Sequence, residues 1–519
     1  MNRNELLSRV FQHSSKDWDI IIIGGGATGA GIALDAASRG YDTLLLEQED
    51  FGKGTSSRST KLIHGGVRYL AQGNISLVLE ALMERGLILK NAPHLTFNQQ
   101  FLVPVYSAWE VLKYTAGLKF YDLLAGKLSL GKSSFIGRDE VLHRMPNLKP
   151  EGLKGGVIYH DGQFDDSRLL ISIIRLAIEK GCIALNYCKV THLLKDNNGI
   201  LNGVVSIEGK TGKELRLGAK VVINATGVFS DEVLRMDMPV INRTIRPSQG
   251  IHIVLKREFL DGDTAIMIPK TDDGRVLFII PWYGQLVAGT TDTPVDDAGL
   301  EPKALEHEIN FILNTAGRYL IKAPERKDIL TVFAGLRPLI ARPDDPSSTR
   351  ELSRSHRISI SESGLLSVEG GKWTTYRRMA QDALDRAIKR GMLEKKACVT
   401  HSLSITGENN HIDKNDRLRI YGNNMDAIRL LTNEGNGKTI HPLLPYTEAE
   451  IIWICRNEMP VKVEDILARR TRALFLNARA SIEMAPVVAS IMAEEMGFDA
   501  EWKKRQVEEY GELVKNYIV

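Results

Sequence analysis

The sequence contains few cysteines and no long apolar run. Its 519 residues include 4 cysteines, with no C-x-x-C pair and no histidine spacing that suits zinc: Cys182, Cys188, Cys398 and Cys455. No metal site is therefore expected, and reduced structural thiols indicate a cytosolic compartment. No stretch approaches about 18 uninterrupted apolar residues, so no membrane-spanning helix is expected. Residues 1–19 also lack the apolar core of a signal peptide.

Net charge is low as well. The formal net charge of +3 is too small for general nucleic-acid binding, which needs a concentrated basic face. Any anion site must therefore be local. The chain is 43% hydrophobic and 25% charged, as globular proteins are, and its length suggests about two or three domains. No internal repeat or low-complexity tract is evident.

The order of the expected elements indicates an α/β fold. Residues 19–23 read as a buried strand, residues 27–39 as a helix and residues 43–46 as a second strand, which is the pattern of a parallel sheet. Residues 240–295 alternate like an antiparallel sheet. Further helices are expected at 74–92, 168–181, 303–320 and 374 to about 390. From about residue 391, after a polar linker that includes 407–410, amphipathic helices predominate.

A glycine fingerprint lies between the first strand and the first helix. GGGATG places Gly24, Gly26 and Gly29 in the pattern G-x-G-x-x-G. These glycines allow a tight turn, a close approach of backbone to a pyrophosphate, and close packing of helix on strand. Glu47 ends the second strand, where a carboxylate can bond ribose hydroxyls. Together they predict a dinucleotide site.

FAD and NAD are distinguished by features outside this fingerprint. Its place near the N-terminus, the later strand VVINATG (221–227), and the lack of a second G-x-G-x-x-G favour tightly held FAD. In SVEGGKWTTYR (367–377), Gly370 and Gly371 precede a helix expected to start near Thr374. Its positive end could approach a flavin ring. A routine turn with Thr374 as N-cap remains the alternative.

Several longer segments resemble one enzyme family. They are DIIIIGGGATGAGIALDAASRG, LLLEQEDFGKGTSSRSTKLIHGGVRYL, VINATGVFSD, FAGLRPL, GGKWTTYR and, near the C-terminus, LARRTRALFLNARA. Together they are similar to the FAD-dependent glycerol-3-phosphate dehydrogenases, among the D-amino-acid oxidase-like flavoproteins. The resemblance implies a two-dinucleotide fold of the glutathione-reductase type, with an antiparallel-sheet substrate domain and a C-terminal helical domain. Expected boundaries are 1–90, 150–235 and 351–390 for FAD, 91–149 and 236–350 for substrate, and 391–519 for the helical domain.

The resemblance also implies an activity. This is the oxidation of sn-glycerol 3-phosphate to dihydroxyacetone phosphate by hydride transfer to FAD, with electrons passed to a membrane quinone. A monotopic enzyme on the cytoplasmic face of a bacterial inner membrane is expected, because no transit peptide or EF-hand loop is evident. Alternatives are an oxygen-using glycerol-3-phosphate oxidase, an amine or hydroxy-acid oxidase, a nicotinamide-dependent dehydrogenase, and a redox-responsive interaction module. The C-terminal helices could brace the FAD domain, form a homodimer surface or contact another partner.

Candidate substrate residues follow from the chemistry and the resemblance together. A phosphate dianion needs cations, and arginine offers a rigid fork for its oxygens. The candidates are Arg68, Tyr69, Arg337, Arg354 and Lys372.

For the hydroxyl proton, His252 is the first candidate, since an imidazole near its ordinary pKa suits a general base at neutral pH. Arg337 could share the task by stabilising the developing alkoxide, and Asp292 is a weaker alternative. A lone strand histidine is also often a hydrogen-bonded core residue.

The crowded loop STKLIHGGVRYL is expected to serve both ligands. The resemblance assigns Ser56, Ser57, Lys61, His64 and Gly65 to the cofactor, while Arg68 and Tyr69 turn towards the substrate phosphate.

A second distinctive segment covers residues 109–132. It holds Trp109, Tyr114, Phe120 and Tyr121 among lysines, which predicts either an interfacial helix on a membrane or a helix packed on the substrate domain.

Overall fold

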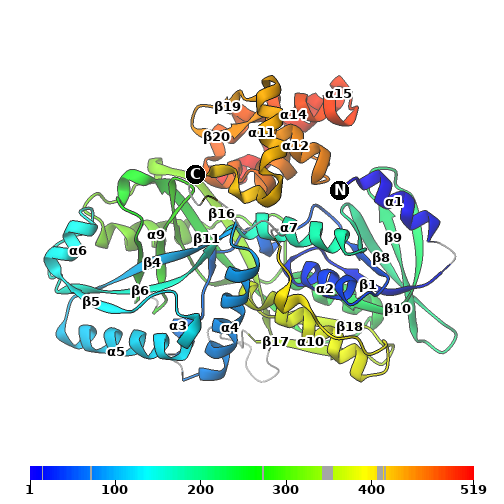
Figure 1. The fold of residues 1–519 in the computed structure, drawn as a ribbon, viewed down its shortest axis with the longest axis horizontal. Helices are drawn as coiled ribbons and strands as arrows, with labels where there is room; N and C mark the ends of the chain where they lie inside the picture. The colour runs from blue at the N-terminus through cyan, green and yellow to red at the C-terminus, as the bar shows by residue number, and fades with distance from the viewer. Residues whose placement is uncertain are drawn as a thin grey trace.

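The computed structural model describes residues 1–13, 16–70, 73–269, 271, 274–341, 355–405, 413 and 416–519, without the side chain of Arg68. Figure 1 shows two α/β bodies side by side, with the C-terminal helices above them. The expected fold class, α/β with mixed sheets and a C-terminal helical part, is confirmed.

The first sheet has the strand order β17-β18-β10-β1-β2-β7, with β8 and β9 extending it beside β10. Strands β18, β10, β1, β2 and β7 run parallel, and β17 is antiparallel to β18. The bounds are β1 Trp18–Ile23, β2 Thr43–Leu46, β7 Ile183–Leu185, β8 Cys188–Lys195, β9 Leu201–Glu208, β10 Glu214–Asn224, β17 His356–Ile360 and β18 Leu366–Gly370.

The strand–helix–strand start is confirmed almost residue for residue. Strand β1 is nearly continuous apolar sequence, as expected for a parallel strand buried on both faces. Helix α2 (Ala27–Ser38) packs on α7 (Asp166–Glu179) and α10 (Tyr376–Lys389). The approach to α10 is close, since a Cβ at Gly31 would lie 2.8 Å from Tyr376 Cδ2. The small residues of α2 therefore let three helices cover one face of the sheet.

The second sheet has the order β15-β11-β14-β13-β12-β4-β6-β3, with β16 beside β11 and β5 beside β6. Neighbours are antiparallel except β4 and β12. The bounds are β3 Leu62–Ile63, β4 Thr96–Val105, β5 Ser134–Gly137, β6 Gly155–Phe164, β11 Ile245–Lys256, β12 Ala265–Ile268, β13 Leu277–Trp282, β14 Gln285–Gly289, β15 Thr293–Pro294 and β16 Ile329–Ile340. In the β11–β16 ladder His252 faces Phe333 and Ser248 faces Arg337.

The remaining helices before residue 391 lie around these sheets. They are α1 Arg3–Gln12, α3 Val67–Leu70, α4 Ile75–Asn91, α5 Ala108–Ala125, α6 Arg138–Arg144, α8 Ser230–Asp237 and α9 Glu306–Tyr319. The helix expected over 109–132 is shorter than predicted, because Gly126 takes a φ of +50° and ends it. Helix α10 follows a 3₁₀ turn at Trp373–Thr375, so its N-cap is Thr375, not Thr374.

Residues 416–519 form the C-terminal module. Its helices are α11 Met425–Leu431, α12 Glu448–Asn457, α13 Ala473–Leu476, α14 Ala478–Met496 and α15 Ala500–Val514. It also contains the hairpin β19 Thr439–His441 and β20 Leu444–Thr447, which was not predicted. The expected linker residues 407–410 lie outside the described residues.

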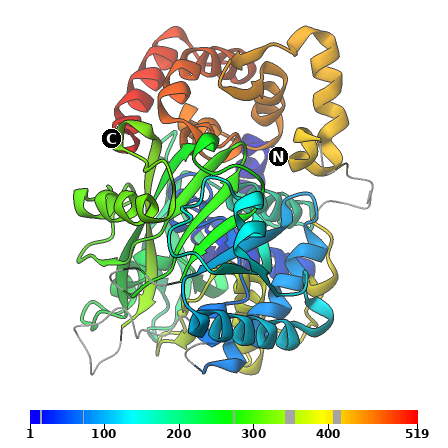
Figure 2. The ribbon, with the colours of Figure 1, turned by 90° about the vertical axis from the view of Figure 1, so that its left-hand side faces the viewer.

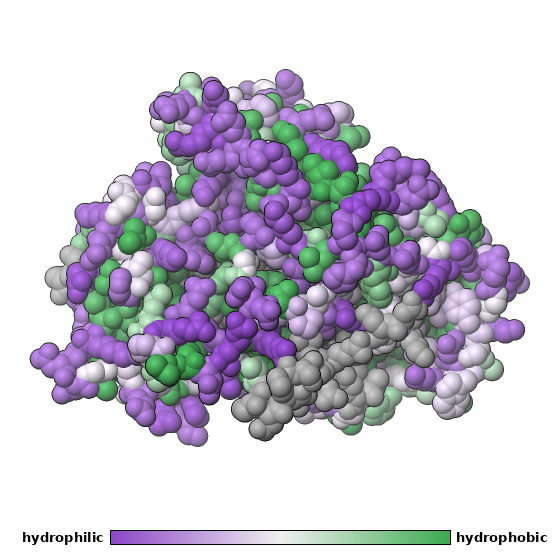
Figure 3. Space-filling model, turned by 180° about the vertical axis from the view of Figure 1, so that it is seen from behind, coloured by the Kyte–Doolittle hydropathy of each residue, from purple (hydrophilic) through white to green (hydrophobic). Residues whose placement is uncertain are grey.

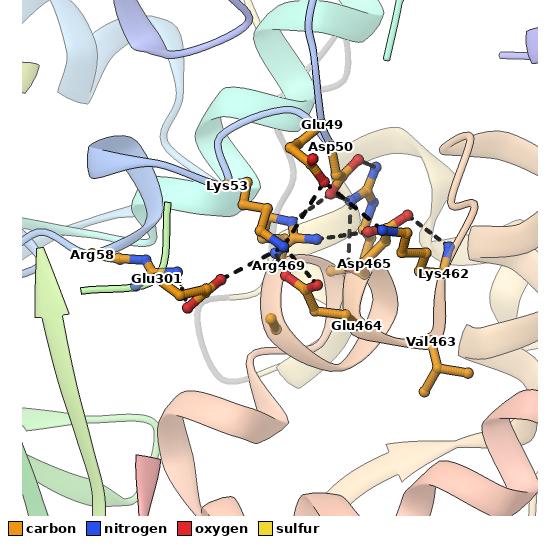
Figure 4. A network of polar contacts seen from close by, with 12 residues as sticks. Glu49, Asp50, Lys53, Arg58, Glu301, Lys462, Val463, Glu464, Asp465 and Arg469 are labelled. Atoms are coloured by element: carbon orange, nitrogen blue, oxygen red, sulfur yellow. Dashed lines mark hydrogen bonds and ion pairs between the residues drawn. The ribbon is translucent and has the colours of Figure 1, made fainter. Parts of the chain in front are cut away.

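Buried ion pairs dock this module on the first body (Figure 4). Arg469 binds Asp50, and its other nitrogens pair with Glu464 at 2.7 Å and Asp465 at 2.6 Å. Lys53 Nζ lies 2.9 Å from Glu464, in a second link between the two parts. Removing one member of a buried pair typically costs about 3–5 kcal/mol, since the other charge is left uncompensated. Polar docking therefore fixes the module firmly.

Within the described ranges, none of the helices has the length and apolarity needed to cross a membrane.

Candidate functional site

A narrow groove runs along the carboxyl ends of the first sheet. Its volume is about 190 Å³, and it is lined by Gly24, Gly26, Glu47, Ser56, Thr226 and Gly371, among others. We call it the nucleotide groove. Helix α2 points its N-terminus at the groove, and its N-cap, Gly26, has no side chain to bond the first N–H groups. A helix start whose N-cap residue has no side chain suits a diphosphate.

The fingerprint glycines are required by close contacts. Gly24 has a φ of +106°, and a Cβ there would lie 2.8 Å from the Ala225 carbonyl oxygen. A Cβ at Gly29 would lie only 1.8 Å from the Gly24 carbonyl oxygen. No larger residue fits at Gly29 unless the turn moves, which is the structural reason for the pattern.

The two polar groups predicted beside the fingerprint lie at the groove. Glu47 accepts hydrogen bonds from the Gly25 N–H at 2.6 Å and the Glu49 N–H at 2.9 Å, and burial raises its pKa to about 7. Ser56 Oγ accepts the Ala27 N–H at 2.9 Å. Both side chains therefore hold the turn around which a dinucleotide would bind.

A larger cavity of about 870 Å³ lies between the two sheets. We call it the central cavity. Five residues that line it also line the nucleotide groove: Thr55, Pro338, Gly371, Lys372 and Trp373. Gly371 has a φ of +83°, and a Cβ there would lie 2.4 Å from Met379 Sδ. The groove and the cavity therefore adjoin near the start of α10, where a second cofactor contact is expected.

Arg337 projects from β16 into the central cavity. One guanidinium nitrogen donates to Thr290 Oγ1 at 3.0 Å, and another lies 3.6 Å from Asp292 Oδ1. The approach is tight, because a Cβ at Gly250 would lie 2.2 Å from this guanidinium. The arginine is therefore held in a fixed orientation at the cavity wall.

His252 lies on β11 and also lines the central cavity. Its Nε2 is 3.0 Å from Thr60 Oγ1, and its ring stacks on Phe333 with centroids 4.9 Å apart. The expectation of an ordinary pKa is wrong. Burial, followed by the positive charges of Lys61 and Arg337, lowers the pKa of His252 well below its usual 6.5. The imidazole is therefore neutral at physiological pH.

Other predicted residues meet at the same cavity. Lys372 Nζ sits 3.9 Å from the centre of the Tyr69 ring, and both side chains line the cavity, as does His64. Arg354 and the side chain of Arg68 lie outside the described residues.

Three residues assigned to the cofactor lie away from both hollows. Ser57, Lys61 and Gly65 are buried, and neither hollow is lined by them. Lys61 Nζ instead binds Asp166 at 2.7 Å and the Ser57 carbonyl oxygen at 2.8 Å. A Cβ at Gly65 would lie 2.2 Å from the Tyr121 hydroxyl, so this glycine serves the packing of α5. Their contact with a cofactor stays a prediction.

The sequence reasoning missed Thr60, Thr290 and Asp166. Thr60 lies inside the loop STKLIHGGVRYL, so its place in that loop was a usable signal in the sequence. Thr290 follows β14, and its role depends on strand pairing. Asp166 carried no local signal, because its partners come from distant segments. In the described part of the chain, no group of acidic, cysteine and histidine residues could hold a metal ion.

Comparisons with known proteins cover nearly the whole chain. Residues 19–377 match the family of FAD dependent oxidoreductases, and residues 366–503 match the C-terminal domain of alpha-glycerophosphate oxidase. The chain is 39% identical to a probable mitochondrial glycerol-3-phosphate dehydrogenase of Caenorhabditis elegans, over 98% of this chain and 74% of that protein. It is 38% identical to the mitochondrial glycerol-3-phosphate dehydrogenase of Homo sapiens, over 95% and 73%.

Solved structures agree with these relatives. The glycerol-3-phosphate dehydrogenase of Bacillus halodurans complexed with FAD superimposes with a TM-score of 0.79 at 30% identity, covering 100% of this chain and 98% of that one. The L-alpha-glycerophosphate oxidase of Mycoplasma pneumoniae, at 17% identity and a TM-score of 0.57, shares the fold over 74% of this chain.

Proposed function

The chain belongs to the FAD-dependent glycerol-3-phosphate dehydrogenases, and on that premise we propose that its central cavity oxidises sn-glycerol 3-phosphate to dihydroxyacetone phosphate, with a membrane quinone as final acceptor. FAD supplies the hydride acceptor. The chain's own part is to bind, orient and deprotonate the substrate.

The nucleotide groove fits this cofactor. Gly24, Gly26 and Gly29 leave room for backbone to approach a diphosphate, and Glu47 is the acceptor for ribose hydroxyls. Because the groove adjoins the central cavity at Gly371, the far end of a long dinucleotide would lie beside the substrate. The wall that groove and cavity share is the observation that carries the proposal.

The phosphate is held by cations on the wall of the central cavity. We assign this task to Lys372, with the Tyr69 hydroxyl as a further donor. Arg68 and Arg354 are proposed as additional ligands. A carboxylate substrate would also attract arginine, so the choice of a phosphate rests on the family.

His252 is proposed to accept the hydroxyl proton. Because the ring is neutral at physiological pH, it has a lone pair available for this proton. The guanidinium of Arg337 on the next strand stabilises the negative charge that develops on the substrate oxygen. The neutral His252 would thus accept the proton, and the cationic Arg337 would stabilise the negative charge.

The first test is a single anaerobic mixing. The purified flavoprotein is expected to lose the visible absorbance of oxidised flavin when sn-glycerol 3-phosphate is added without oxygen or dye. Slow recovery in air would indicate a dehydrogenase, and rapid recovery an oxidase. A flavin that stays oxidised with this substrate, but is reduced by an amino or hydroxy acid, contradicts the assignment of a phosphate.

The quinone is proposed to use the apolar arm of the central cavity. This arm is lined by Phe101, Leu118, Phe120, Tyr159, Met267 and Phe278. Two of these residues, Leu118 and Phe120, belong to α5. Apolar walls of this kind suit the ring and tail of a lipid-soluble acceptor.

Helix α5 and the adjoining α4 are proposed as the membrane surface. On α5, Trp109 is 70% exposed, Leu112 60% and Leu123 72%, and on α4 Met83 is 60% exposed. Figures 1 and 2 both place α5 along the lower edge, away from the C-terminal module. The face in Figure 3 carries mainly hydrophilic residues with smaller apolar areas between them. The inner face of a bacterial membrane is the proposed location.

Removing the apolar side chains of α5 should release the protein from lipid. The triple variant Trp109→Gln, Leu112→Gln, Leu123→Gln is expected to bind anionic vesicles at least about tenfold more weakly in co-sedimentation, because each large side chain contributes about 1.5–3 kcal/mol when buried. A second variant, with Lys113, Lys119 and Lys127 changed to glutamate, should also bind more weakly, and more so at low salt.

The control for this surface lies in the C-terminal module. Leu430 and Leu443 are 63% and 65% exposed there, and their change to glutamine should leave vesicle binding intact. Equal losses in both sets of variants would mean that α5 is not the membrane surface.

A further inference from the structure

Arg472 of the C-terminal module contacts the segment that leads into the cavity-lining residues Ser59 and Thr60. Arg472 precedes α13, is 1% exposed, and has a φ of +68°, a conformation that non-glycine residues adopt only when their surroundings hold them. Its guanidinium donates to the carbonyl oxygens of Ala468 and Ser57, each at 2.9 Å, and to Asp166 Oδ1 at 3.0 Å. The side chain therefore joins the module to the loop that lines the cavity.

Asp166, at the start of α7, is the centre of this contact. It is fully buried, and its Oδ2 accepts the Ser59 N–H at 3.1 Å, the Ser59 hydroxyl at 2.7 Å and Lys61 Nζ at 2.7 Å. Lys61 also has a positive φ, +65°. Arg472 binds the other oxygen of the same carboxylate. Asp166 thus fixes the residues on both sides of Thr60.

Thr60 is the residue that this arrangement presents to the reaction site. Its Oγ1 lies 3.0 Å from His252 Nε2, and Thr60 itself lines the central cavity. The other ring nitrogen of His252, Nδ1, is buried and has no hydrogen-bond partner among the described residues. Among the described residues, the Thr60 hydroxyl is therefore the hydrogen-bond partner that sets the proton arrangement of the ring, while the stacked Phe333 helps to fix its tilt.

We propose that Arg472 and Asp166 are positioning residues for proton transfer, which hold the turn Ser59–Lys61 so that Thr60 orients His252. The C-terminal module then has a part in the reaction itself, through a chain of contacts from Arg472 to Asp166, Thr60 and His252. The inference rests on the proposed role of His252 as proton acceptor.

The first arm of the test addresses the contact with His252. Thr60→Val removes the hydroxyl at nearly constant volume and should slow anaerobic flavin reduction by glycerol 3-phosphate about ten- to a hundredfold, because the reacting groups lose alignment. Thr60→Ser should restore most of the rate. Bound FAD, measured by absorbance, and the thermal unfolding midpoint should stay near the wild-type values in both variants.

The second arm addresses the distant residue. Arg472→Lys keeps the buried charge but loses the fork whose two terminal nitrogens bind Ala468 on one side and Ser57 and Asp166 on the other. It should therefore slow reduction to a similar extent. The double variant with Thr60→Val should be no slower than Thr60→Val alone, since both changes act on one contact. If Arg472→Lys does not fold, Ser59→Ala tests the same hold on the turn from the other side of Asp166.

The matched control is Arg470→Lys. Arg470 is equally buried in the module but binds Asp50 and the Glu458 carbonyl, not the cavity loop. It should lower the unfolding midpoint and leave the reduction rate of the folded protein unchanged.

The outcomes separate the inference from the proposed function. If the wild-type flavin is not reduced by the substrate, the function is wrong and the inference falls with it. If the wild type is reduced, a full rate in Thr60→Val, or additive effects in the double variant, overturns the inference alone. An equal loss of rate in Arg470→Lys would show that the module acts only through overall stability, which also overturns it.

Discussion

Replacing His252 with glutamine should slow the reduction of bound FAD by glycerol 3-phosphate by about 10²–10⁴-fold. Glutamine can keep a hydrogen bond to Thr60, but it has no basic nitrogen to accept the hydroxyl proton. The rate is to be measured by anaerobic stopped-flow absorbance, which reports the first half of the reaction without the final acceptor. FAD content should be unchanged, because His252 does not line the nucleotide groove.

His160 provides the control for this prediction. It lies on β6 of the same sheet but does not line the central cavity, so His160→Gln should reduce FAD at the wild-type rate. A wild-type rate in His252→Gln would mean that another group accepts the proton. Asp292, which lines the same cavity, would then be tested by Asp292→Asn.

The second large effect is expected at Gly29. Gly29→Ala should yield protein without FAD, because the added Cβ would lie 1.8 Å from the Gly24 carbonyl oxygen and force the turn to open. Contacts under about 3 Å cannot be relieved by a side-chain rotation here, since the neighbour is backbone of the same fingerprint. Bound flavin after gel filtration, and the thermal unfolding midpoint with and without added FAD, measure the effect.

Gly511→Ala is the appropriate comparison. Gly511 lies in α15, where a Cβ meets nothing within 4 Å, and alanine in a helix is favoured over glycine by about 1 kcal/mol. That variant should keep its FAD and be slightly more stable. Full FAD occupancy in Gly29→Ala would mean that the fingerprint tolerates a wider turn than the structure has.

The sequence predicted best where structure depends on neighbours along the chain. Strand β1, the glycine turn and α2 follow from apolar runs and small residues within about two dozen positions, and their bounds agree closely with the prediction. Helix α5 was predicted too long, because the apolar pattern continues past Gly126 while the backbone does not. The hairpin of the C-terminal module was missed because its short strands have no extended alternation.

The candidate site was predictable only in part. Four candidates come from separate segments of the chain: Arg337, His252, Tyr69 and Lys372. The resemblance to a family predicted that they share one site, and all four line the central cavity. Lys61 shows that the direction of a side chain could not be predicted from its local sequence. A lysine in a glycine-rich loop looks like a ligand for a cofactor, but its direction depends on Asp166 and on the rings of Trp282 and Phe475. No local pattern encodes those contacts.

The buried pairs between the C-terminal module and the first body have a consequence for biosynthesis. Asp50 leaves the ribosome 420 residues before Arg470, and Asp166 does so 306 residues before Arg472. Until Arg469 and Arg470 are made, the Asp50 carboxylate must stay hydrated or take up a proton, because a lone charge in an apolar interior is costly. Asp166 can already pair with Lys61, but it lacks its second cation. The nascent chain therefore cannot close its core around the flavin from the N-terminus onward. Residues 469–472 therefore complete the ion pairs of a domain whose first strand is β1.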